Sequence, residues 1–345
     1  MQLAATFDRI LCDCGGVLDL PIVLPMPPSG ERVAGPEPKY TVSEEALNRA
    51  SLGAGPTPLL RWAETQEVWL KCDHLLPTGS FKDRGAWSVI ARALELGINE
   101  VVVDSSGNAA AALAAHAARA GIGCTVFVPK ATSAGKVGQI RTYGATVNLV
   151  DGPREASKQA ALSHARNMNI FYAGHSTNPY FHDGTKSWFY EIVTKLPEVQ
   201  TVVVPVGSGS LFLGLIRAID ELIASGWIAR APKIVVAQAD GYDPLSSFRL
   251  KAGVGEGTAP EHPVAEGIAI RNPVRLAQLR QRVTELGVLV ISVDSDEILS
   301  AQEELGHGGI FVEPTSAAAW AAWRRTKDLQ PTVVALTGHG LKSVA

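Results

Sequence analysis

From about residue 67 onward, short runs of apolar and β-branched residues alternate with longer segments of helical composition. The runs EVWLK, EVVVD, CTVFVP and TVNLV are each followed by such a segment, and TVVVPVG, KIVVAQAD and TVVALTG continue the pattern after residue 200. Short, almost uniformly apolar strands that alternate with helices are typical of parallel sheets with helices on both faces. The alternation therefore predicts an α/β fold built from repeated strand–helix units.

The length of the chain and its early composition predict three sections. At 345 residues, the chain is long enough for two compact halves. The segment LPIVLPMPPSGERVAGPEP holds most of the early prolines, which suit an extended arm better than a helix because they lack an N–H donor. We expect a mostly irregular N-terminal arm at residues 1–50, an α/β domain at 51–195 and a second α/β domain at 196–345.

The charge and the cysteine content narrow the class of partner and the compartment. The formal net charge is −3, which argues against nucleic acid or an anionic membrane surface as the main partner. The four cysteines follow no disulfide pattern, the N-terminus lacks the features of a signal peptide, and the alanine-rich segment is interrupted by His116 and Arg119. We therefore expect a cytoplasmic protein, outside the membrane, that acts on a small molecule.

A glycine-rich turn follows the apolar run TVVVPV and precedes a helical segment. Such a turn presents backbone N–H groups beside the positive end of a helix dipole and can bind a phosphate. A Walker loop would need Gly-Lys-Ser/Thr, and a dinucleotide fingerprint would need a glycine earlier than Gly214 and an acidic residue closer than Asp240. A tight turn without a ligand and a cup for one phosphate remain as alternatives. The cup would consist of Gly207, Ser208, Gly209 and Ser210.

Two further predicted strands end in polar turns. In VVVDSSGNAAAA, Asn108 is either the N-cap of the following helix or an amide donor directed toward a ligand at the carboxyl ends of the strands. In VVALTGHGLK the turn holds Thr337 and His339, and no second histidine stands at a metal-ligand spacing. Cys12 and Cys14 are too close in sequence for a zinc site, so we expect no metal.

Lys82 lies in the motif PTGSFKDRG, directly after a Thr-Gly-Ser turn. A solvated lysine titrates at about 10.4, so a nucleophilic lysine must be desolvated or lie near another cation. A lysine in a fixed motif, a phosphate cup, an amide and a hydroxyl are together the set of groups that pyridoxal phosphate requires. The residues therefore predict this cofactor, with Lys82 as the amine that forms a Schiff base with its aldehyde.

The motifs PTGSFKDRG, SSGN, VPVGSGSLFLG, EGIAIRNPVR, FVEPTSAAA and LTGHGLK resemble, in this order, those of threonine synthase and its relatives among the fold type II pyridoxal-phosphate enzymes. The resemblance implies two open twisted sheets flanked by helices, with pyridoxal 5'-phosphate in the cleft between two domains, and a homodimer. It implies that Lys82 is the Schiff-base lysine, that Asn108 donates to the ring oxygen and that Thr337 faces the ring nitrogen. It also implies that residues Gly207 to Leu211 hold the phosphate and that Phe81 borders the cofactor.

Two positions on the substrate side depart from the pattern of threonine synthases. Ala109 stands where a threonine usually follows the asparagine, and Phe181 stands near the position of an arginine that grips the substrate phosphate. Candidate replacements for that cation are His182, Lys186 and Arg271. The substrate-side residues are expected to be Ser80, Ser105, Ser106, Asn178 and Lys186.

The predicted function is elimination or replacement on an amino acid by a pyridoxal-phosphate lyase, and the first hypothesis is conversion of O-phosphohomoserine to threonine and phosphate. The alternative reaction is β-elimination or β-replacement on serine, threonine or O-phosphoserine, as in dehydratases or cysteate synthases. A protein that binds the cofactor without turnover is the alternative outside enzymes, and Lys82, Asn108 and Thr337 count against it. A nucleotide-dependent oxidoreductase does not fit the glycine spacing.

Overall fold

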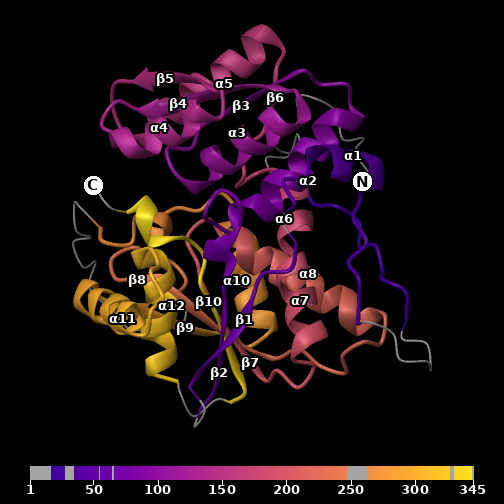
Figure 1. The fold of residues 1–345 in the computed structure, drawn as a ribbon, viewed down its shortest axis with the longest axis vertical. Coiled ribbons are helices and arrows are strands. Elements are labelled where there is room, and N and C mark those ends of the chain that lie inside the picture. Colours follow the sequence, from indigo (N-terminus) through magenta and orange to yellow (C-terminus); the bar gives the residue numbers. More distant parts are fainter. Residues whose placement is uncertain are drawn as a thin grey trace.

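The computed structural model describes residues 17–27, 35–53, 55–63, 66–246, 263–326 and 330–343. Within the predicted N-terminal arm, residues 18–27 and 35–43 form no helix or strand, and α1 (Glu44–Ala50) is helical. Cys12 and Cys14 lie outside the described residues. The molecule has two α/β parts, one around each of two sheets, which lie one above the other along its longest axis (Figure 1). Helices α2 (Lys82–Glu95) and α6 (Pro179–Thr185) lie between them.

The smaller sheet contains four parallel strands in the order β5-β4-β3-β6. These strands are β3 (Glu100–Val103), β4 (Gly123–Pro129), β5 (Thr146–Val150) and β6 (Phe171–Tyr172). They are connected by α3 (Asn108–Ala120), α4 (Ala134–Thr142) and α5 (Arg154–Met168). Val101 and Val103 pack into the same core as α3 and α4, whereas Val102 packs with α5 on the opposite face. Helices therefore cover both faces, as the alternation in the sequence predicted.

The larger sheet has the strand order β1-β2-β10-β7-β8-β9, in which β1 is antiparallel to β2 and the other neighbouring pairs are parallel. Its strands are β1 (Leu59–Ala63), β2 (Gln66–Lys71), β7 (Thr201–Pro205), β8 (Lys233–Ala239), β9 (Leu289–Val293) and β10 (Thr332–Ala335). One face packs against α7 (Ser187–Lys195), α8 (Ser210–Ala224) and α10 (Leu276–Glu285). The other face packs against α11 (Ser295–His307) and α12 (Pro314–Arg324). The α/β class with two sheets flanked by helices is thus confirmed.

Strands β1 and β2 belong to the larger sheet although they precede the smaller sheet in sequence. Strand β2 pairs with β10, which pairs with β7, so residues 66–71 lie beside strands from the second half of the chain (Figure 1). The predicted ranges 51–195 and 196–345 therefore do not follow the sheets, because pairing between distant strands is not encoded in a local alternation of strands and helices. No helix among the described residues is long and apolar enough to span a lipid bilayer.

Candidate active site

Lys82 is held at the start of α2 by a backbone contact to the end of β10. After β2 the chain passes through a 3-10 helix, η1 (Asp73–Leu75), and a turn in which Gly79 has a φ of +80°, a conformation that favours glycine. The Phe81 N–H donates to the Thr337 carbonyl at 2.9 Å. This hydrogen bond places Lys82 at the carboxyl ends of two adjacent strands of the larger sheet.

The glycine-rich turn between β7 and α8 lies within hydrogen-bond distance of the lysine. Lys82 Nζ donates to Ser210 Oγ at 2.8 Å. Gly209 has a φ of +83°, and a Cβ at Gly207 would lie 2.8 Å from the Cα of Ile268, so both positions require glycine. No side chain of the described residues caps the first turn of α8, which leaves its backbone N–H groups available to an anion. The amine and the predicted phosphate cup are therefore parts of one site.

The remaining residues of the predicted cup lie at the same turn. The hydroxyl of Ser208 is buried and lies 3.4 Å from the hydroxyl of Ser210. Leu211 is buried in the core formed with α8. The two serines thus add hydroxyl groups to the backbone N–H groups, while Leu211 anchors the start of the helix.

The amine of Lys82 lies close to aromatic rings. Its Nζ is 4.4 Å from the ring centroid of Phe81 and 5.5 Å from that of Phe181. Burial lowers the pKa of Lys82 to about 7, the charge of Arg154 lowers it as well, and the carboxylate of Glu313 opposes both. A lysine with this pKa supplies a neutral, nucleophilic amine near neutral pH.

Asn108 is the first residue of α3, and it contacts Glu313, the N-cap residue of α12 beside the larger sheet. The N-cap of α3 is Gly107, and no side chain caps that helix, so Asn108 does not serve as the cap. Instead, Asn108 Nδ2 donates to Glu313 Oε2 at 2.9 Å. Burial raises the pKa of the Glu313 carboxyl. The motif FVEPTSAAA did not by itself indicate a role for Glu313, and the available signal was a carboxyl directly before the proline that starts a helix.

Thr337 is fixed by Ser316, whose role the motif FVEPTSAAA did not by itself indicate. Ser316 Oγ accepts from the backbone N–H groups of Thr337 and Gly338 at 2.8 Å and 3.0 Å. The hydroxyls of Thr337 and Ser316 are 3.2 Å apart, and both residues are buried. Thr337 is thereby held next to the backbone that leads into Lys82.

The three serines expected on the substrate side lie at two strand ends. Ser80 forms a β-bridge with Gly338, and its buried hydroxyl has no hydrogen-bond partner among the described residues. Ser105 and Ser106 lie in the loop after β3, where Ser105 Oγ accepts from the Gly107 N–H at 3.3 Å. Ser80 therefore lies two residues before Lys82, and Ser105 and Ser106 lie directly before Gly107 and Asn108.

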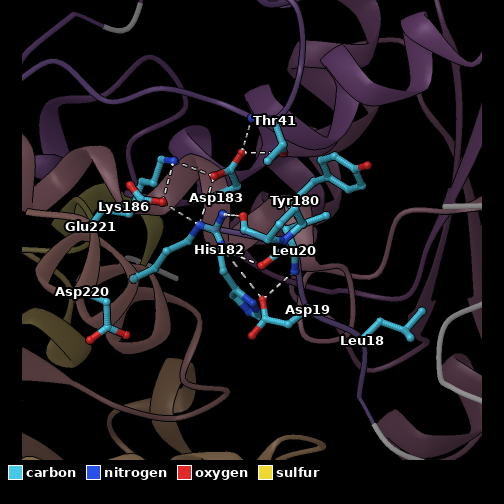
Figure 2. A network of polar contacts seen from close by, with 12 residues as sticks. Leu18, Asp19, Leu20, Thr41, Tyr180, His182, Asp183, Lys186, Asp220 and Glu221 are labelled. Atoms are coloured by element: carbon cyan, nitrogen blue, oxygen red, sulfur yellow. Dashed lines mark hydrogen bonds and ion pairs between the residues drawn. The ribbon is translucent and has the colours of Figure 1, made fainter. Parts of the chain in front are cut away.

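Asn178 and Lys186, by contrast, serve the structure around α6. Asn178 Oδ1 accepts from the Tyr180 N–H at 3.0 Å and so caps the helix. Lys186 is fully buried and forms ion pairs with Asp183 at 2.8 Å and with Glu221 at 3.1 Å (Figure 2). Lys186 therefore has no exposed surface with which to meet a substrate.

His339 takes part in the backbone structure at the end of the chain. Its Nδ1 accepts from the Leu341 N–H at 3.2 Å and caps the 3-10 helix η3 (Gly340–Lys342). Within the described part of the chain, no three His, Cys, Asp or Glu side chains are grouped so that they could hold a metal ion.

Comparison with known protein families gives a match over most of the chain. The family described as "Pyridoxal-phosphate dependent enzyme" matches residues 50–338. A threonine synthase of Methanocaldococcus jannaschii is 32% identical, with 96% of this chain and 88% of that protein covered. A threonine synthase of Methanosarcina acetivorans is 36% identical, with 84% of this chain and 75% of that protein covered.

Solved structures with a similar fold include enzymes with other names. Maize serine racemase has a TM-score of 0.70 at 22% identity, covering 86% of this chain and 92% of that chain. The serine racemase of Dictyostelium discoideum has a TM-score of 0.69 at 24% identity, covering 86% of this chain and 96% of that chain. The likeness to these two racemases shows the fold alone.

Proposed function

The chain belongs to the family of pyridoxal-phosphate dependent enzymes, and from this premise we propose that it converts O-phosphohomoserine and water to threonine and phosphate. The observation that carries the assignment of the site is the 2.8 Å hydrogen bond between Lys82 Nζ and Ser210 Oγ, because it joins a reactive amine to an anion-binding turn. The reaction class, that of a lyase acting on an amino acid, follows from the threonine synthase relatives.

The residues of the site fit pyridoxal 5'-phosphate. Residues Gly207 to Leu211 would hold its phosphate, Lys82 would bond to its aldehyde carbon, and Asn108 would donate to its ring oxygen. The uncapped first turn of α8 provides donors that a phosphate would satisfy. The buried hydroxyl of Ser80, which has no partner in the described structure, is a further group that a ligand would satisfy.

When bound, pyridoxal phosphate supplies an electron sink for the negative charge that develops on Cα of an amino-acid substrate. The neutral hydroxyl of Thr337 would meet the ring nitrogen without requiring it to carry a proton, which suits elimination and replacement. Once the substrate's amino group has taken its place on the cofactor, the freed Lys82 Nζ would accept the Cα proton and later return it. Its pKa of about 7 allows both roles near neutral pH. Phe81 and Phe181 would exclude water from this amine.

A second candidate reaction is β-elimination or β-replacement on serine, threonine or O-phosphoserine. Ala109 and Phe181 favour it for serine and threonine, which carry no phosphate, because both side chains are buried and neither can bind a phosphate by charge or hydrogen bond. A protein that binds the cofactor without turnover is disfavoured by the placement of Lys82 beside Ser210 and by the fixed position of Thr337.

The two reactions are separated by their products. The purified protein, loaded with pyridoxal phosphate, is incubated separately with O-phosphohomoserine, O-phosphoserine, serine and threonine. We expect threonine and phosphate from O-phosphohomoserine. Keto acid from serine or threonine, or turnover of O-phosphoserine alone, would instead establish the second candidate.

The role of Lys82 is tested by trapping the bound cofactor with borohydride. The variant Lys82→Ala should give no trapped adduct and no turnover. The variant Lys130→Ala should keep both, because the Lys130 side chain is 68% exposed. A wild-type protein without a trapped adduct would refute the assignment.

We propose further that the protein is a cytoplasmic homodimer. The resemblance to threonine synthases suggests the dimer, and the two cysteines in the described structure, Cys72 and Cys124, are free and buried, which suits a reducing compartment. Sedimentation equilibrium should give twice the mass of the chain, and a monomeric mass would refute the dimer.

A further inference from the structure

The substrate side of the site lacks the two phosphate contacts that the resemblance would supply. Ala109 has no polar group, and Phe181 is fully buried. The Phe181 ring packs so closely on Gly85 that a Cβ there would lie 2.3 Å from it. Phe181 therefore belongs to the core beneath α2, and a cation for the substrate phosphate must come from another element.

Of the three cations named as replacements, two are buried and the third lies against an aromatic ring. Lys186 is fully buried and forms ion pairs with Asp183 and Glu221 (Figure 2). His182 is buried, and burial together with nearby positive charges lowers its pKa well below the usual value, so it is neutral. Arg271 lies over the ring of Tyr242, 5.4 Å from its centroid, on the segment that follows β8.

Arg154 lies at the same edge of the smaller sheet as the other residues of the site. It is the first residue of α5, directly after β5, and the strands of this sheet are parallel. The carboxyl ends of parallel strands meet at one edge, so Arg154 shares that edge with Asn108, at the start of α3, and with His175, in the turn after β6. The start of α5 therefore lies at the edge of the smaller sheet where α/β proteins bind ligands.

The guanidinium of Arg154 is accessible and acts on the site by its charge. The residue is exposed, and no hydrogen bond or ion pair joins its side chain to another residue in the described part of the chain. Its charge contributes to lowering the pKa values of both Lys82 and His175, which come from different elements. An exposed cation at the carboxyl edge of the smaller sheet, whose charge acts on both side chains, is available to an anionic substrate that meets Lys82.

We propose that Arg154 binds the phosphate group of the substrate, in place of the arginine that Phe181 replaces. This inference rests on the proposed function and names the residue that recognises the anionic substrate. A guanidinium can bind two phosphate oxygens at once, which a lysine ammonium cannot do with the same geometry. Binding of the phosphate would also offset the charge of Arg154 and so raise the basicity of Lys82 when a substrate is present.

The test compares two arginine variants on one helix. Arg154→Ala removes the cation at the start of α5, and Arg166→Ala removes an exposed cation in its last turn. Inorganic phosphate is titrated into each cofactor-loaded protein by calorimetry, and since the bound cofactor fills the cup at residues 207–211, added phosphate reports on a second anion site. L-Serine, which has a carboxylate but no phosphate, is titrated in parallel.

We expect Arg154→Ala to weaken phosphate binding roughly tenfold to a hundredfold, as for the loss of a charge-assisted hydrogen bond, with Arg154→Lys between it and wild type. The KM for O-phosphohomoserine should rise by a similar factor while kcat changes little. Arg166→Ala should match wild type, and serine binding should be unchanged in all variants.

Equal losses in Arg154→Ala and Arg166→Ala would overturn the proposal, because they would report net charge alone. Unchanged phosphate binding in Arg154→Ala, or serine binding weakened as much as phosphate binding, would also overturn it. If wild type binds phosphate through Arg154 but does not turn over O-phosphohomoserine, the proposed reaction fails while this assignment stands.

Discussion

A change of pH through neutrality should convert the Lys82 amine from its protonated to its neutral form, with a midpoint at a pKa of about 7. At pH 7 about half of the Lys82 amines would then be neutral, whereas a solvated lysine with a pKa of ~10.4 would be neutral in roughly one chain in 2,500. The largest cause is burial, since Nζ lies 4.4 Å and 5.5 Å from the centroids of two aromatic rings.

The difference between the pKa of Lys82 in the folded chain and its pKa in the unfolded chain makes the stability of the fold depend on pH. In the unfolded chain Lys82 titrates at about 10.4, so between about pH 7 and about pH 10.4 the unfolded chain binds more protons at this position than the folded chain does. The contribution of Lys82 to the free energy of unfolding therefore rises with pH across this window. It is least favourable below pH 7, where the folded state must bury an ammonium group.

The assay is competitive labelling of the cofactor-free protein with a limiting amount of acetic anhydride, followed by mass spectrometry of the peptides. Lys130 is an internal reference because its side chain is 68% exposed. Labelling of Lys82 should level off above about pH 8, whereas labelling of Lys130 should still be rising there. Parallel curves for the two lysines would refute the desolvated amine. The variant Glu313→Gln should move the Lys82 midpoint lower, because it removes the carboxylate that stabilises the ammonium.

Two further predictions concern the packing around the site. Asp183→Asn should lower the free energy of unfolding by about 3–5 kcal/mol in urea, because the buried cations Lys186 and Arg217 would then share a single carboxylate, Glu221, and one buried charge would be left uncompensated. Asp151→Asn, at an ion pair with side chains 68% and 85% exposed, should change it by less than about 1 kcal/mol, and equal effects would contradict a stabilising role for the buried charges. Gly338→Ala should cost about 1–3 kcal/mol, since a Cβ would lie 2.2 Å from the carboxyl carbon of Glu313. Gly138→Ala, whose Cβ would have no described residue beyond its own helix turn within 4 Å, should instead gain about 0.5–1 kcal/mol in the helix, and a neutral Gly338→Ala would refute the close contact.

The N-terminal arm illustrates how tertiary contacts order a segment that lacks a pattern of its own. Its prolines predict no helix or strand, and residues 18–27 form none. Arg217 donates to the carbonyl of Leu20 at 3.0 Å, and Arg275 donates to the carbonyl of Leu18 at 2.8 Å. Figure 2 shows this part of the arm beside the buried charges of α6 and α8. The arginines that hold the arm come from the second half of the chain.

The sequence by itself determined the strand–helix units, the turn with glycines at 207 and 209, and the motif around Lys82. Each of these depends on local physics: the spacing of apolar residues, the φ values open to glycine, and the helix that follows a turn. Local helix geometry likewise separates Arg84 from Lys82, because residues two apart point to different faces of a helix, and Arg84 pairs with Asp73 and Glu191.

Only the tertiary structure decided which distant groups share the site. It placed Glu313 against Asn108 and enclosed Lys186 among buried carboxylates. It also placed Arg154 where its charge lowers the pKa of Lys82. These outcomes depend on the order of strands in two sheets, and that order is set by pairing between segments far apart in the chain. A local pattern of apolar residues specifies that a strand forms and which faces it buries, but it does not specify the neighbours beside which the strand ends.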